Sequence, residues 1–140
     1  MPKNISVIVP RIYIGDRAAA DDEKTLLHYG ITHIVRACGT KAKFGHINYH
    51  FCTMKDDPEI CARTKLKDAS AFITAALMKP NTVVLIHCAA GRSRSPLIVM
   101  AYLILHCGHT VETAKELVTK MRKQTIFRSA FIEQLRSFLK

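Results

Sequence analysis

The sequence predicts an α/β domain in which a central, mostly parallel sheet is flanked by helices. Two observations lead to this fold class. Strand-like apolar segments alternate with segments of helical periodicity as far as the middle of the chain, and the remainder is helical, which is the order of a layered α/β domain. In addition, residues 82–87 (TVVLIH) form the most β-branched apolar run, as expected for a central strand covered on both faces.

The first expected elements are a strand pair and a helix. Residues 6–16 (SVIVPRIYIGD) predict two short strands or one bent strand, with Pro10 placing the break at a sheet edge. Asp16 is a suitable N-cap for one helix over residues 17–29, and Gly30 is suited to end that helix.

Two further strands and a helix precede the central strand. Residues 31–38 (ITHIVRAC) and 47–54 (INYHFCTM) are apolar or alternate as strands do, and Pro58 indicates a loop after them. The next helix is predicted because its apolar side chains recur at helical spacing. These side chains are Leu66, Ala69, Phe72, Ile73, Ala76 and Leu77.

Three helices are expected after the central strand and a polar turn. The first spans about residues 96–107 and has a proline in its first turn, where the missing N–H would have no helical partner anyway. Thr110 is a suitable N-cap for a second helix over residues 111–124. Residues 129–140 predict a last amphipathic helix.

The composition limits the classes of protein to consider. The 140 residues predict one domain, 1–140, long enough to bury most of its apolar surface. A hydrophobic content of 49% excludes an intrinsically disordered chain, and no apolar run reaches membrane-spanning length. The net charge of +10 favours anionic partners such as phosphoproteins, nucleic acid or inositol lipids, without choosing among them.

Cysteine and histidine usage adds expectations about location and cofactors. Five cysteines without a CxxC pair, and an N-terminus without a secretory signal pattern, predict a reduced intracellular protein, cytoplasmic or also nuclear. Seven histidines show no metal-ligand spacing, so neither a metal nor another cofactor is expected.

The polar turn after residues 82–87 is the candidate active site. Cys88 lies at the carboxyl end of the central strand, where open α/β sheets bind ligands. The following N–H groups converge toward a helix N-terminus, an arrangement that binds anions. Gly91 permits unusual backbone angles, and Arg94 offers a guanidinium matched to two phosphate oxygens. The predicted phosphate-binding residues are Ala89, Ala90, Gly91, Arg92, Ser93 and Arg94.

The same positive field predicts that Cys88 is a nucleophile at neutral pH, because helix N-termini and cations lower the pKa of a thiol. Its thiolate would attack phosphorus and form a thiophosphoryl enzyme, which water then hydrolyses. Ser95 is placed to donate its hydroxyl to the sulfur, which would ease departure of the thiolate. His87 is expected to support the loop by hydrogen bonding rather than to act as a base.

These residues carry a resemblance to a known family. Residues 87–95 (HCAAGRSRS) match the HCxxGxxR(S/T) signature of the cysteine-dependent protein tyrosine phosphatase superfamily. AAGRSRSP followed by AYLI resembles the small dual-specificity phosphatases, and PRIYIGD, LLHYGITHIVRAC and FIEQLRSFL extend the likeness over nearly the whole chain. The resemblance implies the phosphatase fold and hydrolysis of phosphotyrosine, phosphoserine and phosphothreonine in proteins.

The family also requires a general acid that protonates the leaving oxygen, normally an Asp on a loop upstream of the cysteine. CTMKDDPEI offers Asp56 and Asp57 for this role. Resemblance to the family's pattern, an Asp after a strand and then a small or polar residue, favours Asp56. Asp57 remains the alternative, although its place before Pro58 also suits a simple turn residue.

Three arginines differ from the family's pattern or vary within it. Arg128 in FRSAF stands where the family usually has an Asn, and Arg36 in IVRAC replaces a second Asn. Either arginine would supply a substitute donor or add charge near the site. Arg92, at the variable rim of the loop, is either a surface arginine or a second cation that favours doubly phosphorylated or acidic substrates.

Two other functions would use the same features. One is a phosphatase acting on RNA 5′ ends or phosphoinositides, which the basic charge favours. The resemblance speaks against both, because the loop lacks the lysines of lipid phosphatases and has Ser95 where RNA triphosphatases usually have Thr. The other is a phosphate-binding module without turnover, which the missing Asn residues favour and Cys88 and Arg94 oppose. A phosphoprotein substrate is therefore expected, with nucleic acid less favoured.

Overall fold

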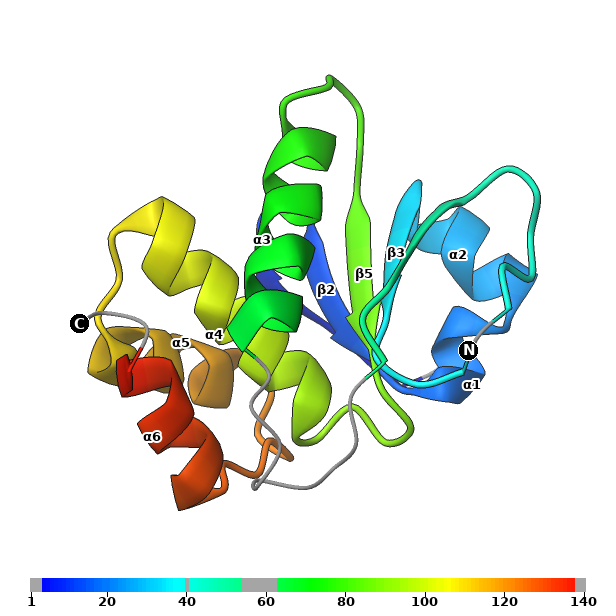
Figure 1. The fold of residues 1–140 in the computed structure, drawn as a ribbon. Helices are drawn as coiled ribbons and strands as arrows, with labels where there is room; N and C mark the ends of the chain where they lie inside the picture. Colours follow the sequence, from blue (N-terminus) through cyan, green and yellow to red (C-terminus); the bar gives the residue numbers. More distant parts are fainter. Residues whose placement is uncertain (1–3, 40, 54–62, 138–140) are drawn as a thin grey trace.

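A computed structural model describes residues 4–39, 41–53 and 63–137. The strands are Ile5–Val9 (β1), Ile12–Gly15 (β2), His33–Arg36 (β3), Asn48–Phe51 (β4) and Val84–His87 (β5). The helices are Arg17–Ala20 (α1), Glu23–Tyr29 (α2), Arg63–Leu77 (α3), Arg94–Cys107 (α4), Val111–Met121 (α5) and Ser129–Ser137 (α6). Figure 1 shows these elements along the chain.

The five strands form one sheet in the order β1-β2-β5-β3-β4. β1 and β2 pair antiparallel, and β2, β5, β3 and β4 run parallel to one another. The predicted fold class is therefore confirmed, with β5 at the centre. The register places Gly15 and Arg36 on either side of His87, so these three residues end their strands at the same level.

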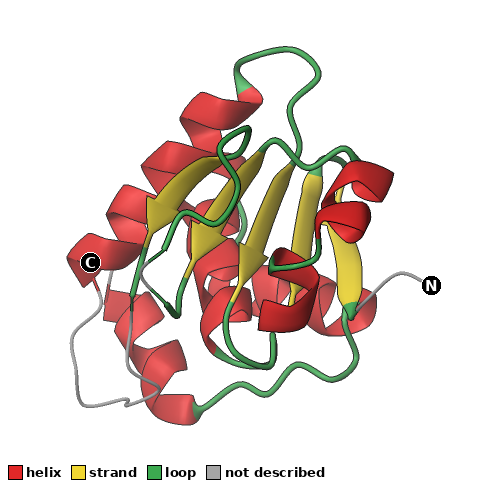
Figure 2. Ribbon diagram, turned by 90° about the vertical axis from the view of Figure 1, so that its right-hand side faces the viewer, coloured by secondary structure: helices red, strands yellow, loops and turns green. Residues whose placement is uncertain are grey.

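Helices cover both faces of the sheet (Figure 2). Successive residues of a strand point to opposite faces, and β5 shows this alternation. Val84 and Ile86 belong to the larger core, which includes buried residues of α3, α4 and α5. Leu85 belongs to a smaller core with residues of α1, α2 and β3. His87 therefore shares the face of the smaller core with Leu85.

The structure corrects the helix predicted over residues 17–29, which is two helices. Asp16 caps α1 as expected, with its side chain accepting a hydrogen bond from the N–H of Ala19 at 2.9 Å. Asp22 then begins a second helix, because its extended backbone and its side-chain acceptor for the N–H of Thr25 form a new N-cap. Gly30 ends α2 in the left-handed conformation, as predicted.

The later helices form where the sequence predicts them, although α5 ends at Met121, three residues before the predicted end. α4 begins at Arg94, two residues earlier than expected, and ends before Gly108, whose φ is 74°. Thr110 caps α5 and forms a capping box with Thr113. Among the described residues, no helix has the length and apolarity that crossing a membrane would require.

Candidate active site

The loop between β5 and α4 lies at the carboxyl edge of the sheet, low in Figure 1. Cys88 directly follows β5, and Arg94 is the first residue of α4. Cys88 therefore stands at the end of a strand, as predicted, and Arg94 stands at the start of the helix, which begins two residues earlier than expected. Residues of this loop line a hollow on this edge of the sheet. Its lining residues are Cys88, Ala89, Ala90, Arg92, Ser93, Arg94, Ile126 and Arg128.

The Cys88 sulfur is surrounded by hydrogen-bond donors. The N–H of Gly91 donates to Sγ at 3.2 Å, and Oγ of Ser95 lies 3.3 Å from Sγ. Burial by itself would raise the pKa of this thiol. The hydroxyl of Ser95 and the N–H groups of Ser95, Ser93 and Gly91 outweigh burial and lower the pKa below its ordinary value. The thiolate is thus stabilised chiefly by hydrogen bonds from the loop and from the first turn of α4.

Gly91 is required by both its conformation and its surroundings. Its φ of 67° lies in the left-handed region. A Cβ at this position would also lie only 2.7 Å from the carbonyl oxygen of Gly15. The phosphate loop therefore packs directly against the end of β2, and no larger residue fits at this position without moving the loop.

The buried side chain of Arg122 holds the loop through a hydrogen bond to its backbone, a contact that the sequence prediction missed. Its side chain is only 1% exposed. Nε donates to the carbonyl oxygen of Gly91 at 2.7 Å, and Nη1 donates to Oγ of Ser6 at 2.9 Å. The sequence did contain a signal, because Arg122 directly follows α5 and lies four residues after the buried Val118, which is the spacing of one helix face.

His87 is buried beneath the loop. Its Nδ1 lies 3.3 Å from the carbonyl oxygen of Cys88. Burial, aided by the positive charge of Arg36, lowers the pKa of His87 to about 4. The imidazole is therefore neutral at pH 7, which suits a structural contact more than proton transfer.

The two arginines that stand in place of Asn have different surroundings. Arg36 is buried, and its Nη1 donates to Oδ1 of Asp21 at 3.1 Å. It therefore pairs with the α1–α2 junction, on the face of the sheet that also carries His87. Arg128 is exposed and lines the hollow at Cys88, beside Ile126. Arg92 is also exposed and lines the same hollow.

Both candidates for the general acid, Asp56 and Asp57, lie outside the described residues, as does Cys61. Of the described cysteines, Cys52 is buried in the larger core, and burial raises the pKa of its thiol to about 11. Within the described ranges, no three His, Cys, Asp or Glu side chains form a group that would hold a metal ion.

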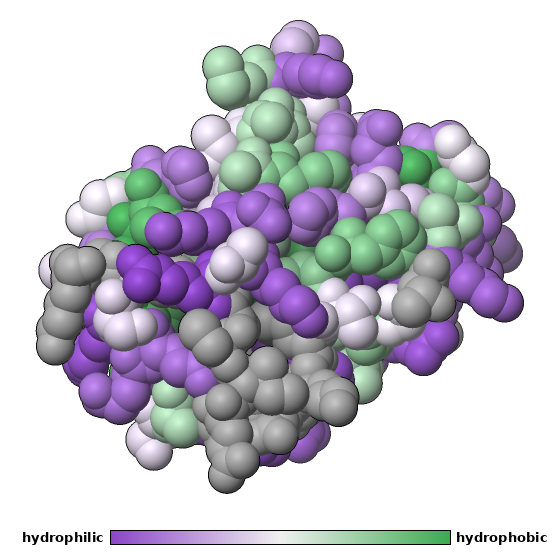
Figure 3. Space-filling model, in the orientation of Figure 1, coloured by the Kyte–Doolittle hydropathy of each residue, from purple (hydrophilic) through white to green (hydrophobic). Residues whose placement is uncertain are grey.

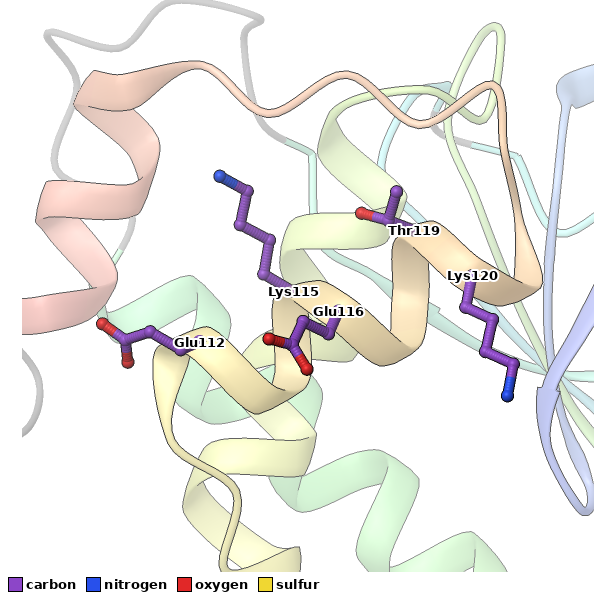
Figure 4. Close-up of a pocket in the computed structure, with 5 residues that line it drawn as sticks. All are labelled: Glu112, Lys115, Glu116, Thr119 and Lys120. Carbon is purple, nitrogen blue, oxygen red and sulfur yellow. The ribbon is translucent and has the colours of Figure 1, made fainter.

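A second hollow lies along one side of α5 (Figure 4). Its lining side chains are Glu112, Lys115, Glu116, Thr119 and Lys120. None of these is a cysteine or an arginine, so this hollow lacks the predicted chemistry. Figure 3 shows the face seen in Figure 1, where hydrophilic side chains predominate and apolar ones form smaller patches among them.

Comparison with known proteins gives matches over most of the chain. The family model described as "Dual specificity phosphatase, catalytic domain" matches residues 12–140. Dual specificity protein phosphatase 13B from Homo sapiens is 32% identical over 141 residues, covering 94% of this chain and 71% of that protein.

Solved structures of dual specificity phosphatases have a similar fold. A mouse dual specificity phosphatase complexed with zinc tungstate gives a TM-score of 0.90 at 27% identity, covering 99% of this chain and 87% of that chain. DUSP15 also gives a TM-score of 0.90, at 26% identity, covering 97% of this chain and 87% of that chain.

Proposed function

Because this chain belongs to the dual specificity phosphatase catalytic-domain family, we propose that its Cys88 loop carries out the hydrolysis and that residues 1–140 form one catalytic domain. The protein is a cysteine-dependent phosphatase for phosphotyrosine, phosphoserine and phosphothreonine in proteins. The placement of the Cys88 sulfur between the N–H of Gly91 and the hydroxyl of Ser95, at the head of α4, supports these residue roles most directly.

The first step forms a covalent intermediate. Backbone N–H groups of residues 89–94 and the guanidinium of Arg94 hold the phosphoryl oxygens of the substrate. The Cys88 thiolate attacks phosphorus, so that an S–P bond forms as the bond from phosphorus to the side-chain oxygen breaks. Asp56 donates its proton to that oxygen, which leaves as a neutral hydroxyl group.

The second step releases inorganic phosphate. Asp56, now a carboxylate, takes a proton from a water molecule whose oxygen attacks phosphorus. The S–P bond breaks, and its electron pair returns to the sulfur of Cys88. The Ser95 hydroxyl, 3.3 Å from Sγ, and the Gly91 N–H stabilise the thiolate as it leaves. His87 and Arg122 hold the loop in position without touching the reacting atoms.

The substrate is a phosphoprotein inside the cell, in the cytoplasm or also in the nucleus. The hollow at Cys88 is lined mostly by loop residues, with Ile126 and Arg128 at its side. Ile126 is 51% exposed, so it offers an apolar surface beside the loop to the side chain that carries the phosphoryl group. The mechanism uses no metal or other cofactor. Nucleic acid is less favoured because no described aromatic side chain lines this hollow.

The assignment is tested by phosphate release from four substrates: phosphotyrosyl peptide, phosphothreonyl peptide, 5′-triphosphorylated RNA and a phosphoinositide. We expect activity on both peptides and none in a Cys88→Ser variant. Activity that persists in this variant would rule out the mechanism, and faster release from RNA or the lipid would assign the site to that substrate. Phosphopeptide binding by the native protein without release would indicate a binding module.

A further inference from the structure

The two edge strands of the sheet, β1 and β4, differ in how they are protected. The pairing of β1 with β2 shifts register between Val7 and Val9, and Pro10 follows. Bulges and prolines keep an edge strand from pairing with another chain. β4 pairs with β3 residue for residue from Asn48 to Phe51, and its sequence, NYHF, has no proline, lysine, arginine or acidic residue. The β4 edge therefore lacks these protective features.

Alternate residues of β4 direct their backbone groups away from β3. The N–H groups of Asn48 and Cys52 donate to carbonyl oxygens at or next to the two ends of β3, at 3.0 and 2.8 Å. Successive residues of a strand pair toward opposite sides, so the N–H and C=O groups of Tyr49 and Phe51 face the open edge. Within the described ranges, no other segment forms a backbone hydrogen bond with these two residues.

Two hollows lie between β4 and α3. Asn48 lines the first hollow and His50 the second. The ring of His50 stacks on that of Phe72, with ring centres 5.1 Å apart, so this pair lies where the hollows meet. In Figure 2, β4 is the outermost strand at the left and α3 lies behind it. α3 contributes one stripe of its surface, with residues that recur every three or four positions: Lys65, Asp68, Phe72, Ala75 and Lys79.

The spacing of the hollows suits an added strand. A strand beside β4 would place every second side chain on the side of α3. Asn48 and His50 are two positions apart, about 7 Å along a strand, so side chains i and i+2 of the added strand would reach the two hollows. The half-buried ring of Phe72 and the small, exposed Ala75 give the first hollow an apolar surface with room for a β-branched side chain.

The charge of the groove favours an acidic partner. Lys79 lines the first hollow and Lys65 the second, and Asp68 is the one carboxylate among their described lining residues. The whole chain carries a net charge of +10. Pairing of β4 with β4 of a second copy would bring these lysines toward the same lysines of that copy, which is unfavourable. An acidic segment of another protein avoids this repulsion.

We propose that β4 and the facing stripe of α3 form a docking groove for an extended, acidic segment of another protein, which adds to the sheet as a sixth strand. The backbone of this segment pairs with the outward groups of Tyr49 and Phe51. Two of its alternate side chains fill the hollows, and its acidic ends lie near Lys79 and Lys65. No residue of the groove lines the hollow at Cys88, so the proposal does not depend on the proposed function.

The test uses a fluorescein-labelled peptide that has two glutamates at each end of Val-Thr-Val-Thr-Val and no phosphoryl group. Fluorescence anisotropy with the full chain should give saturable binding, with a Kd of about 100 µM or lower. N-methylation of one alternating set of peptide amides should weaken binding about tenfold or more, because these amides pair with β4. Methylation of the other set, which faces solvent, should be tolerated. Absence of binding, or equal Kd values for the two methylated peptides, would overturn the proposal.

Substitutions on α3 test the groove itself. Ala75→Glu fills the first hollow and Lys79→Glu reverses its cation; both side chains are exposed, so the fold should be kept. We expect each change to weaken peptide binding about tenfold or more. Lys67→Glu is the matched control, because Lys67 is an exposed lysine of α3 that lines neither hollow. Equal weakening by Lys67→Glu would mean that net charge alone determines binding, and would overturn the groove.

Amide hydrogen exchange followed by NMR locates the contact. Saturating peptide should slow exchange of the Tyr49 and Phe51 N–H groups about tenfold or more. Binding without this protection would overturn strand addition. Concentration-dependent dimerisation that protects the same N–H groups without peptide would assign the edge to a second copy and overturn the acidic partner. Because the probe carries no phosphoryl group, the Cys88→Ser protein should give the native Kd, so a failure of hydrolysis does not affect this test.

Discussion

Arg122 holds the phosphate loop through Gly91: its Nε donates a 2.7 Å hydrogen bond to the Gly91 carbonyl oxygen, 31 positions earlier in the chain. The same guanidinium reaches Ser6 in β1, so one buried side chain joins α5, the loop and the first strand. The loop's N–H groups point toward the phosphate only if its carbonyl groups, which point the other way, are fixed by hydrogen bonds. This relationship therefore links the stability of the fold to the geometry of the site.

Replacing Arg122 by Ala is expected to reduce both stability and activity. The change leaves the Gly91 carbonyl without its buried donor, which predicts a loss of about 3 kcal/mol in the free energy of unfolding. It also lets the loop shift, which predicts a fall in kcat of about tenfold or more. Urea unfolding and steady-state kinetics on an aryl phosphate measure the two effects.

Arg136→Ala serves as the control for this prediction. Arg136 is an exposed arginine of α6 that pairs with Glu112 at 2.7 Å. An ion pair in solvent contributes little to stability, so neither the unfolding midpoint nor kcat is expected to change. If Arg122→Ala behaves like this control, Arg122 does not support the loop.

The Ser95 hydroxyl is expected to matter for the reactivity of Cys88. It is the first of the hydrogen bonds that lower the Cys88 pKa against the opposing effect of burial. Ser95→Ala should therefore raise this pKa, so that alkylation of Cys88 by iodoacetamide reaches its maximum at higher pH than in the native protein. Breakdown of the thiophosphoryl intermediate should also slow by about tenfold, the effect of one lost hydrogen bond.

Mass spectrometry of the Cys88 peptide measures the alkylation, and rapid-quench kinetics measure the intermediate. Cys52 is an internal control, because burial raises the pKa of its thiol to about 11 and it should react little at neutral pH. An alkylation profile that is the same in Ser95→Ala and native protein would contradict the prediction.

The site residues that are close together in the sequence could be predicted. The contacts that hold them in place from distant parts of the chain could not. Cys88, Gly91 and Arg94 lie within one turn, so local rules for strand ends, helix N-termini and glycine are sufficient to group them. The contact between Arg122 and Gly91 depends on how α5 packs against the sheet. Periodicity places Arg122 in line with the buried face of α5, directly after the helix, but it does not say which carbonyl group the side chain meets there.

The fold likewise divides into features that local sequence predicts and contacts that depend on how distant elements pack. The mostly parallel sheet, the end of α2 at Gly30 and the end of α4 at Cys107 agreed with the sequence prediction, because each could be inferred from local sequence patterns. The break between α1 and α2 at Asp22 was missed because Asp16 alone was a sufficient N-cap for a single helix over residues 17–29. The pairing of Arg36 with Asp21 could not be predicted, since it requires α1, α2 and β3 to be placed in space.

His87 predicts a specific dependence of stability on pH. Its pKa is lowered to about 4 in the folded protein, against about 6.5 for an unperturbed histidine in the unfolded chain. Between these values the unfolded chain binds a proton that the folded protein does not. The contribution is therefore fully present above pH 6.5 and is lost as the pH falls toward 4, at up to about 1.4 kcal/mol per pH unit.

Urea unfolding of native protein and a His87→Gln variant between pH 7 and pH 4.5 tests this prediction. The native protein should lose stability more steeply than the variant as the pH falls. Part of the slope should remain in the variant, because burial also lowers the pKa values of His33 and His50. Parallel curves for the two proteins would mean that His87 is not held neutral in the folded state.

The choice between Asp56 and Asp57 as the general acid is decided by leaving-group dependence. A general acid protonates the leaving oxygen, so its removal matters most when that oxygen leaves as a strongly basic alkoxide or phenolate. Asp56→Asn should therefore slow hydrolysis of a phosphothreonyl peptide by about a hundredfold or more and of an activated nitrophenyl phosphate much less. Asp57→Asn is the matched control, with a uniform and small effect on both substrates. The reverse pattern, with selectivity for the poor leaving group in Asp57→Asn, would assign the role to Asp57.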